Sequence, residues 1–489
     1  MFRPPSVTEV GRIPGVVLAA ATATALLTSL LTGCVGQAAD PAALASHPSV
    51  TGVGDPYFPM DGNAGIDVKR YRIRDAYQFD SGRLTGRTTL TITATKRLPK
   101  FSLDFLLPVS KVRLSTGGAT YSQQTKHELV ITPAKAIAAG QRFKATVTYA
   151  GVPGDEQYVG YNSWHADEHE VVTMDEPHMS PWWFPANDHP TDKALMDISI
   201  TVPRGNTVIS NGEQVSRRSS GDRTTYRWRA AEPMATYLAF FAAGEFAVSR
   251  GITDGVPWVN AVSRQGTQAE RKGSRKMLAQ TPGFVTWLAS RLGDYPFAQS
   301  GGVVTSLDVG FSLETQTRPV YGFYVPEGSA PLLVHELAHQ WFGDSVSLER
   351  WRDIWLNEGF ASFMPWMYDE DHGGWSAQKH LESSYDTYPA SSEFWKRGVL
   401  DPGPDLVDLF GGAVYERGAM TLQALRNRIG DEAFWTVLRT WVADHRHGNA
   451  TTAELVALAE QVSGQDLGEF FEVWLETPER PAQTADNGL

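Results

Sequence analysis

The sequence is poor in cysteine and has no excess of basic residues. Cys34 is the single cysteine among 489 residues, so no disulfide can form within the chain and the fold depends on its core. Lysine and arginine number 43 against 55 aspartates and glutamates, which gives a formal net charge of −12. Because nucleic-acid binding selects clustered lysine and arginine, we expect no nucleic-acid partner.

The N-terminal apolar stretch is too short to cross a bilayer. Its apolar core, residues 16–31, follows two arginines and ends in LTGC, whereas a membrane helix needs roughly 20 apolar residues. These features predict a signal peptide over residues 1–33. The LTGC ending resembles a bacterial lipobox, and a plain leader with an incidental cysteine is the alternative. Lipidation of Cys34 would anchor the mature protein outside the cytoplasm, on the cell membrane of a bacterium.

The remainder of the chain predicts a multidomain protein. Residues 34–60 are rich in Ala, Gly, Ser and Pro and are expected to be a flexible tether. Residues 61–250 hold short β-branched and aromatic runs separated by turn pairs such as Asn211-Gly212, a pattern that predicts an antiparallel β saddle or sandwich. Residues 251–478 should form a mostly α domain with a small sheet, followed by a disordered tail over residues 479–489.

Hydrophobic periodicity places the expected elements of the second domain. Pro282 should break or kink a helix over residues 269–292. A helix starting near Ser329 or Pro331 should stop at Gly343, and the next should begin near Asp353. Strands are expected over residues 302–309 and 319–325, and further helices over residues 413–428, 431–443, 452–463 and 466–475.

The pentad HELAH at residues 335–339 carries the spacing of a metal site. On a helix, His335 and His339 lie on one face, where a single Zn²⁺ can bridge them. Glu336 is rotated by about 100° from His335, beside that face, where it can act as a general base without being a ligand. Two ordinary histidines one turn apart remain the alternative on this pentad alone.

Glu358, in WLNEGFA on the next apolar helix, changes that balance. An antiparallel return would bring its carboxylate to the two histidines of HELAH, and three protein ligands with one open position is the catalytic arrangement of zinc. We therefore expect one Zn²⁺ per chain. His165 and His169 are also four residues apart, but in a β-rich region that spacing does not bring two ligands together, so a solvated acidic loop is expected there.

With HELAHQWFGD and WLNEGFA in place, residues 65–475 resemble the gluzincin aminopeptidase family, which includes aminopeptidase N and the leukotriene hydrolase. The resemblance implies a thermolysin-like catalytic domain. It implies that His335, His339 and Glu358 bind zinc and that Glu336 is the general base.

Three further residues match family positions. Tyr415, in VYERGAM, matches a tyrosine that stabilises the tetrahedral oxyanion. Glu314, in GFSLET, matches a glutamate that binds the free amino group of the substrate, and Glu176, in DEP, matches a second carboxylate from the β domain. Paired carboxylates favour an ammonium group. The resemblance thus implies a zinc aminopeptidase acting on peptides with a free N-terminus.

The sequence also departs from the family. Phe311 and Ser312 replace a glycine and an alanine in the strand that should bind the substrate backbone. No counterpart is found for the large C-terminal helical domain of many relatives, which predicts a more open cleft. Only Phe311 and Ser312 favour the alternative, a catalytically silent surface lipoprotein that binds peptides or a partner, whereas the intact His335, Glu336, His339, Glu358 and Tyr415 set weighs against it.

Overall fold

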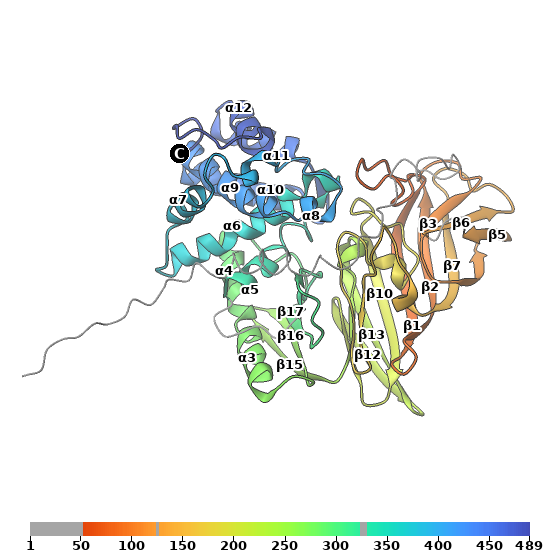
Figure 1. Ribbon diagram of the computed structural model, residues 1–489. Coiled ribbons are helices and arrows are strands. Elements are labelled where there is room, and N and C mark those ends of the chain that lie inside the picture. Colours follow the sequence, from red (N-terminus) through yellow and green to blue (C-terminus); the bar gives the residue numbers. More distant parts are fainter. Residues whose placement is uncertain (1–51, 124–126, 323–329) are drawn as a thin grey trace, which may run out of the picture.

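The computed structural model describes residues 52–123, 127–322 and 330–489 (Figure 1). The predicted signal peptide, Cys34, residues 34–51 of the predicted tether and the predicted helix start at Ser329 lie outside these residues. Within the described part of the chain, no helix is both long and apolar enough to span a bilayer. A β-rich N-terminal half lies beside a largely helical C-terminal half (Figure 1), as the sequence predicted.

A seven-stranded sheet forms the body of the N-terminal domain, in the order β12-β13-β10-β1-β2-β7-β4. Neighbouring strands are antiparallel except β1 and β10, which run parallel. The strands are β1 (Ile66–Gln78), β2 (Arg83–Ala94), β4 (Val109–Leu114), β7 (Arg142–Gly151), β10 (Ala194–Pro203), β12 (Glu213–Ser220) and β13 (Arg223–Met234). Along β1, Tyr71 and Ile73 are buried while Arg72 and Arg74 are exposed. One face of the sheet is therefore packed and the other faces solvent.

Two smaller sheets complete this domain. The three-stranded sheet contains β3 (Phe101–Asp104), β5 (Ala119–Gln123) and β6 (Glu128–Pro133); the four-stranded sheet contains β8 (Trp164–Ala166), β9 (Val171–Thr173), β11 (Thr207–Ser210) and β14 (Phe241–Gly244). Trp182, Trp183 and Trp228 are fully buried in the core. The segment 235–249, which reads as one β run, is split at Gly244, whose φ of 156° and close approach to His169 leave no room for a side chain.

The C-terminal half begins with a five-stranded sheet in the order β15-β16-β17-β19-β18. Its strands are β15 (Phe246–Thr253), β16 (Val256–Ser263), β17 (Ser300–Val304), β18 (Ser312–Leu313) and β19 (Val320–Tyr321). Because β15 pairs with β16, the domain boundary falls before Phe246 and not at residue 250 as predicted. A two-stranded pair, β20 (Ser347–Leu348) with β21 (Asn449–Ala450), lies among the helices.

Most predicted helices are present, but α7 and α8 were not predicted, and α5 ends at Ala338, before the predicted stop at Gly343. They are α3 (Gln268–Leu278), α4 (Thr281–Leu292), α5 (Ala330–Ala338), α6 (Trp355–Asp371), α7 (Ala377–Thr387), α8 (Leu406–Leu409), α9 (Gly418–Ile429), α10 (Asp431–Asp444), α11 (Thr452–Ser463) and α12 (Gly468–Phe471). The chain breaks between α3 and α4, and Pro282 occupies the first turn of α4, where its missing N–H costs nothing.

Both predicted flexible ends are ordered where the structure describes them. Asp55 accepts a hydrogen bond from the backbone N–H of Trp351 at 3.0 Å, and Phe58 packs edge-to-face on the same tryptophan. The prediction that residues 34–60 are a tether is thus wrong for residues 52–60. The predicted disordered tail, residues 479–489, is also wrong. Trp474 Nε1 donates to the carbonyl of Asn487 at 3.0 Å, so aromatic side chains with polar tips hold a polar segment in place.

Direct contacts join the two halves. Lys193, from the loop before β10, donates from Nζ to the carbonyls of Asp344 (2.8 Å), Ser345 (2.9 Å) and Gly448 (3.2 Å). Glu170, just before β9, accepts hydrogen bonds from Ser263 and Thr305 of the C-terminal half. Buried polar contacts of this kind fix the relative position of the domains, because breaking one leaves a buried group unsatisfied.

Candidate active site

Helices α5 and α6 pack together and bring the three predicted ligands to one point. His335 Nε2 lies 3.1 Å from His339 Nε2, and Glu358 Oε2 lies 3.4 Å and 3.5 Å from those nitrogens. Tetrahedral zinc with bonds near 2.0–2.1 Å separates its ligand atoms by roughly 3.3 Å. The triangle therefore has the dimensions of three corners of a zinc site, and these residues could hold the ion.

The far nitrogens of both rings are held by other groups. His339 Nδ1 lies 3.1 Å from the carbonyl oxygen of Phe342, and His335 Nδ1 lies 3.5 Å from Ser362 Oγ. An imidazole that donates from Nδ1 presents the Nε2 lone pair to the site, which is the form a metal requires. The donor set thus fits the ion in distance, and the carbonyl of Phe342 sets the required tautomer of His339.

The electrostatics of the triangle favour a cation. Burial disfavours the charged form of His339, but Glu314 and Glu358 outweigh it and raise the pKa of this histidine well above its ordinary value. Burial alone would raise the pKa of Glu358, yet the charge of His339 and the contacts with both histidines lower it to about 2. The site holds a strong negative field.

Glu336 is buried on α5, at the position predicted for a general base. Burial raises its pKa well above the ordinary value, His339 opposes this, and Glu314 and Glu358 add to it. A carboxyl group that takes up protons this readily suits proton transfer near neutral pH. Its role stays a prediction.

Tyr415 lies beside His335, one of the three predicted ligands. Its ring is nearly parallel to that of His335, with centroids 6.0 Å apart and an interplanar angle of 16°. It sits in a π-helical turn, Ala413–Arg417, directly before α9, where the sequence predicted a continuous helix from residue 413. Turns of this type occur frequently at functional sites because the extra residue redirects side chains. Burial, with Glu358 nearby, keeps the phenol protonated by raising its pKa well above the ordinary value.

Glu176 and Glu314 meet beside Glu358, although they come from different domains. Oxygen atoms of the three carboxylates lie within 4.8 Å of one another. One oxygen of Glu176 and one of Glu314 are buried and have no hydrogen-bond donor in the described part of the protein. Burial raises the pKa of both, and Glu314 further raises that of Glu176. Two unsatisfied carboxylate oxygens facing one site are suited to a cationic group such as an ammonium.

The two family departures lie beside this pair. The side chain of Phe311 is 36% exposed and its ring meets that of His165 on β8 edge-to-face, with centroids 6.1 Å apart. Phe311 therefore contacts the β domain.

His165 and His169 do not come together as ligands. His165 is half-buried on β8, while His169 is exposed and lies 3.3 Å from Glu168. Among the described residues, the groups that could hold a metal ion include neither histidine. The expected solvated acidic loop describes His169 but not His165.

Gln340 is a site residue that the sequence reasoning missed. Its Nε2 donates to the carbonyl of Glu314 at 2.9 Å, and its Oε1 accepts from the backbone N–H of Thr317 at 2.7 Å. Because Gln340 directly follows His339, these two hydrogen bonds tie the GFSLET segment to the metal triangle and fix the position of Glu314 relative to it. The only sequence signal is its place directly after HELAH, which does not reveal a partner 26 residues upstream.

The chain was compared with known families and structures. Residues 71–238 match the peptidase M1 N-terminal domain and residues 327–474 match the peptidase family M1 domain, together about two thirds of the chain. A probable aminopeptidase 1 from Sulfurisphaera tokodaii is 24% identical over 86% of this chain and 54% of its own length. Aminopeptidase N from Lactococcus lactis is 25% identical over 67% of this chain and 41% of its own. The chain spans about half or less of the length of these relatives.

The fold also matches solved structures. An M1 zinc metallopeptidase from Deinococcus radiodurans, solved as a mutant with a Tyr-Ser-Ala substrate, superposes with a TM-score of 0.78 at 24% identity. The match covers 90% of this chain and all of the other. It confirms the two-domain fold class, and the two domain matches confirm the resemblance seen in HELAHQWFGD and WLNEGFA. The chain belongs to peptidase family M1.

Proposed function

We propose that this protein is a zinc-dependent aminopeptidase that removes N-terminal residues from peptides. The single observation that carries the proposal is that a metal site and a pair of carboxylates lie side by side. The triangle of His335, His339 and Glu358 fits one Zn²⁺, and the carboxylates of Glu176 and Glu314 lie directly beside it. A generic metallohydrolase needs only the first set, whereas an exopeptidase also needs a group that recognises the terminal ammonium.

The chemistry divides among the residues of the site. When bound, Zn²⁺ supplies a Lewis acid that polarises the scissile carbonyl and lowers the pKa of water. Glu336 accepts the proton of the attacking water and passes it to the leaving amine. Tyr415 donates a hydrogen bond to the carbonyl oxygen as negative charge develops on it. Glu176 and Glu314 hold the ammonium, so that the first peptide bond is the one presented to these groups.

The proposal is tested with the zinc-loaded protein on a panel of aminoacyl-naphthylamides and N-terminally blocked peptides. We expect hydrolysis of the free-amino substrates only, and loss of this activity in Glu336→Gln. Internal cleavage of blocked peptides, with no release from any aminoacyl substrate, would show an endopeptidase. Equal activity in wild type and Glu336→Gln would assign the hydrolysis to another site or to a contaminant.

We further propose that the mature protein is anchored outside the cytoplasmic membrane by lipid on Cys34. The support is the order of arginines, apolar core and LTGC in the first 34 residues. The full-length protein expressed in a bacterium should partition into the detergent phase of Triton X-114, and Cys34→Ala should not. Partition of both forms into the aqueous phase would reject the anchor.

A further inference from the structure

The solvent face of the seven-stranded sheet is densely basic, although the chain as a whole is acidic. Six arginines on β1, β2 and β13 make up this surface, which we call the arginine face. They are Arg70, Arg72, Arg74, Arg87, Arg227 and Arg229. The side chains of Arg72, Arg227 and Arg229 are 54%, 41% and 45% exposed. The arginine face is therefore accessible to a large partner.

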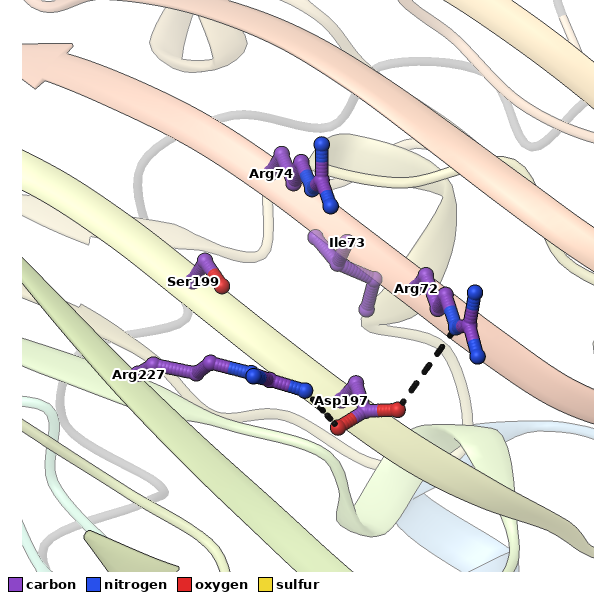
Figure 2. Close-up of a pocket in the computed structure, with 6 residues that line it drawn as sticks. All are labelled: Arg72, Ile73, Arg74, Asp197, Ser199 and Arg227. Atoms are coloured by element: carbon purple, nitrogen blue, oxygen red, sulfur yellow. Dashed lines mark hydrogen bonds and ion pairs between the residues drawn. The ribbon is translucent and has the colours of Figure 1, made fainter. Parts of the chain in front are cut away.

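Two carboxylates lie on this face: Asp197, and the exposed Glu213 on β12, which is opposite Arg229 in the strand register. Asp197, on β10 between β1 and β13, lies within 4.0 Å of four of the arginines; the nearest are Arg227 at 3.0 Å and Arg70 at 3.1 Å. Figure 2 shows Arg72 and Arg227 reaching Asp197 while Arg74 stands beside them without such a link. Two negative charges do not balance the six positive ones, so the arginine face keeps a net positive potential.

The β1–β2 register adds a direct repulsion. Arg74 lies opposite Arg87 in the antiparallel pair, and like charges in that position destabilise a sheet. In the described part of the chain neither arginine forms an ion pair. This repulsion gives the folded protein no stability. An anion bound between the two guanidinium groups would remove the repulsion between them.

The other outward positions supply hydroxyl groups. Thr89 lies opposite Arg72, Ser199 opposite Arg227, and Thr225 opposite Thr201. A surface pocket among them is lined by Arg72, Ile73, Arg74, Asp197, Ser199 and Arg227 (Figure 2). Guanidinium groups with nearby hydroxyl donors match the oxygen atoms of a phosphate.

The spacing points to an extended ligand. Alternate residues on β1 repeat every ~6.7 Å and adjacent strands lie ~4.8 Å apart, so the arginines form rows and not a single cradle. No aromatic side chain stands at the outward positions of residues 70–74, 85–91, 197–201 and 225–229, which removes the stacking that single-stranded nucleic acid uses. The same positions offer no large apolar side chain to enter a bilayer.

We infer that the arginine face binds a linear phosphodiester polymer whose backbone carries no bases, of the glycerol-phosphate kind. The bound polymer would lie across β13, β10, β1 and β2, its phosphates held by the arginine rows. This site lies on the solvent face of the N-terminal sheet and uses none of the residues of the metal triangle or the carboxylate pair.

The test uses a fluorescent oligo(glycerol phosphate) and the zinc-loaded protein, followed by anisotropy over a range of salt concentrations. Arg74→Gln with Arg87→Gln removes two cations that have no ion pair, and Lys100→Gln with Lys272→Gln is the control with the same change in net charge at exposed positions off the arginine face. We expect the Arg74/Arg87 variant to lose at least tenfold in affinity at low salt. The slope of log Kd against log salt should fall by roughly 1.4, from about 0.7 per lost contact. The control should bind like wild type.

Stability gives a second readout, because the Arg74/Arg87 variant should melt at or above the wild-type temperature. Equal affinity and salt slope in wild type and this variant would overturn the inference, as would equal weakening in the control. Tighter binding of oligothymidylate than of the glycerol polymer would assign the face to nucleic acid. Co-sedimentation with phosphatidylglycerol vesicles without binding of the free polymer would assign it to a membrane. Either result would overturn the polymer assignment.

Discussion

Glu314→Gln should weaken catalysis only for substrates that carry a free amino group. Glu314 is 3% exposed, and its Oε1 has no donor among the described residues, so an ammonium would supply its missing partner. A hydrogen bond to a charged group contributes about 1.5–3 kcal/mol. Since 1.36 kcal/mol corresponds to a factor of ten, kcat/KM should fall about 10- to 150-fold.

The assay compares each aminoacyl-naphthylamide with the matching acyl-naphthylamide that lacks the amino group. For wild type the ratio of the two kcat/KM values measures recognition of the ammonium. In Glu314→Gln this ratio should fall by the same 10- to 150-fold, because the slow reaction of the analogue does not use the carboxylate.

Glu170→Gln serves as the matched control. It also removes a buried carboxylate, but one that binds Ser263 and Thr305 at the domain junction. We expect a lower melting temperature and an unchanged substrate ratio. If Glu314→Gln slows both substrates equally, Glu314 maintains the shape of the site and does not bind the ammonium, and the reasoning is refuted.

Three further predictions concern the metal, the tyrosine and pH. A chelator should lower the melting temperature and added zinc should restore it, since an ion at 1,000 times its Kd adds about 4 kcal/mol to the native state; equal melting curves with and without zinc would contradict the site. Tyr415→Phe should reduce kcat by about 10²–10³ with little change in KM, measured at saturating zinc, because it removes one donor to the oxyanion; an effect confined to KM would show a binding role instead. Burial lowers the pKa of His165 to about 4 in the folded protein, whereas the same side chain has a pKa near 6.5 in the unfolded chain. Between pH 4 and 6.5, the unfolded chain therefore binds one proton more than the folded protein. Stability should therefore decrease as the pH falls from 6.5 to 4, by up to about 3 kcal/mol, and His165→Gln should flatten that part of the curve in denaturant titrations.

The metal triangle was predictable because its information is local. Four residues on a helix set the two histidines of HELAH side by side whatever the rest of the chain does. Glu358 needed only a return of the next helix, which the apolar pattern of WLNEGFA indicates. The meeting of Glu176 with Glu314 is different, because it depends on how two domains pack, and only the family resemblance pointed to it.

Other features depend on contacts that no periodicity reveals. The alternation of arginines along β1 can be read from the sequence, but its parallel pairing with β10, which places Asp197 among them, cannot. The contacts of Gln340 and Lys193 join segments far apart in the chain. The ends were mispredicted for a related reason: polar composition indicates exposure, yet backbone carbonyls in such a segment can still satisfy buried tryptophan N–H groups.

The origin of Glu176 in the β domain, and of the metal triangle in the helical half, has a consequence for how such enzymes can diversify. Under the proposed function, one of the two carboxylates that would hold the substrate ammonium, Glu176, is encoded upstream of the stretch that carries Glu314 and the metal ligands, and Lys193 links the two halves. Recombination between relatives at the junction before β15 would exchange Glu176 while keeping Glu314 and the metal triangle together. Expressed alone, the helical half should keep the three metal ligands but lack Glu176, one of the two carboxylates proposed to hold the substrate ammonium.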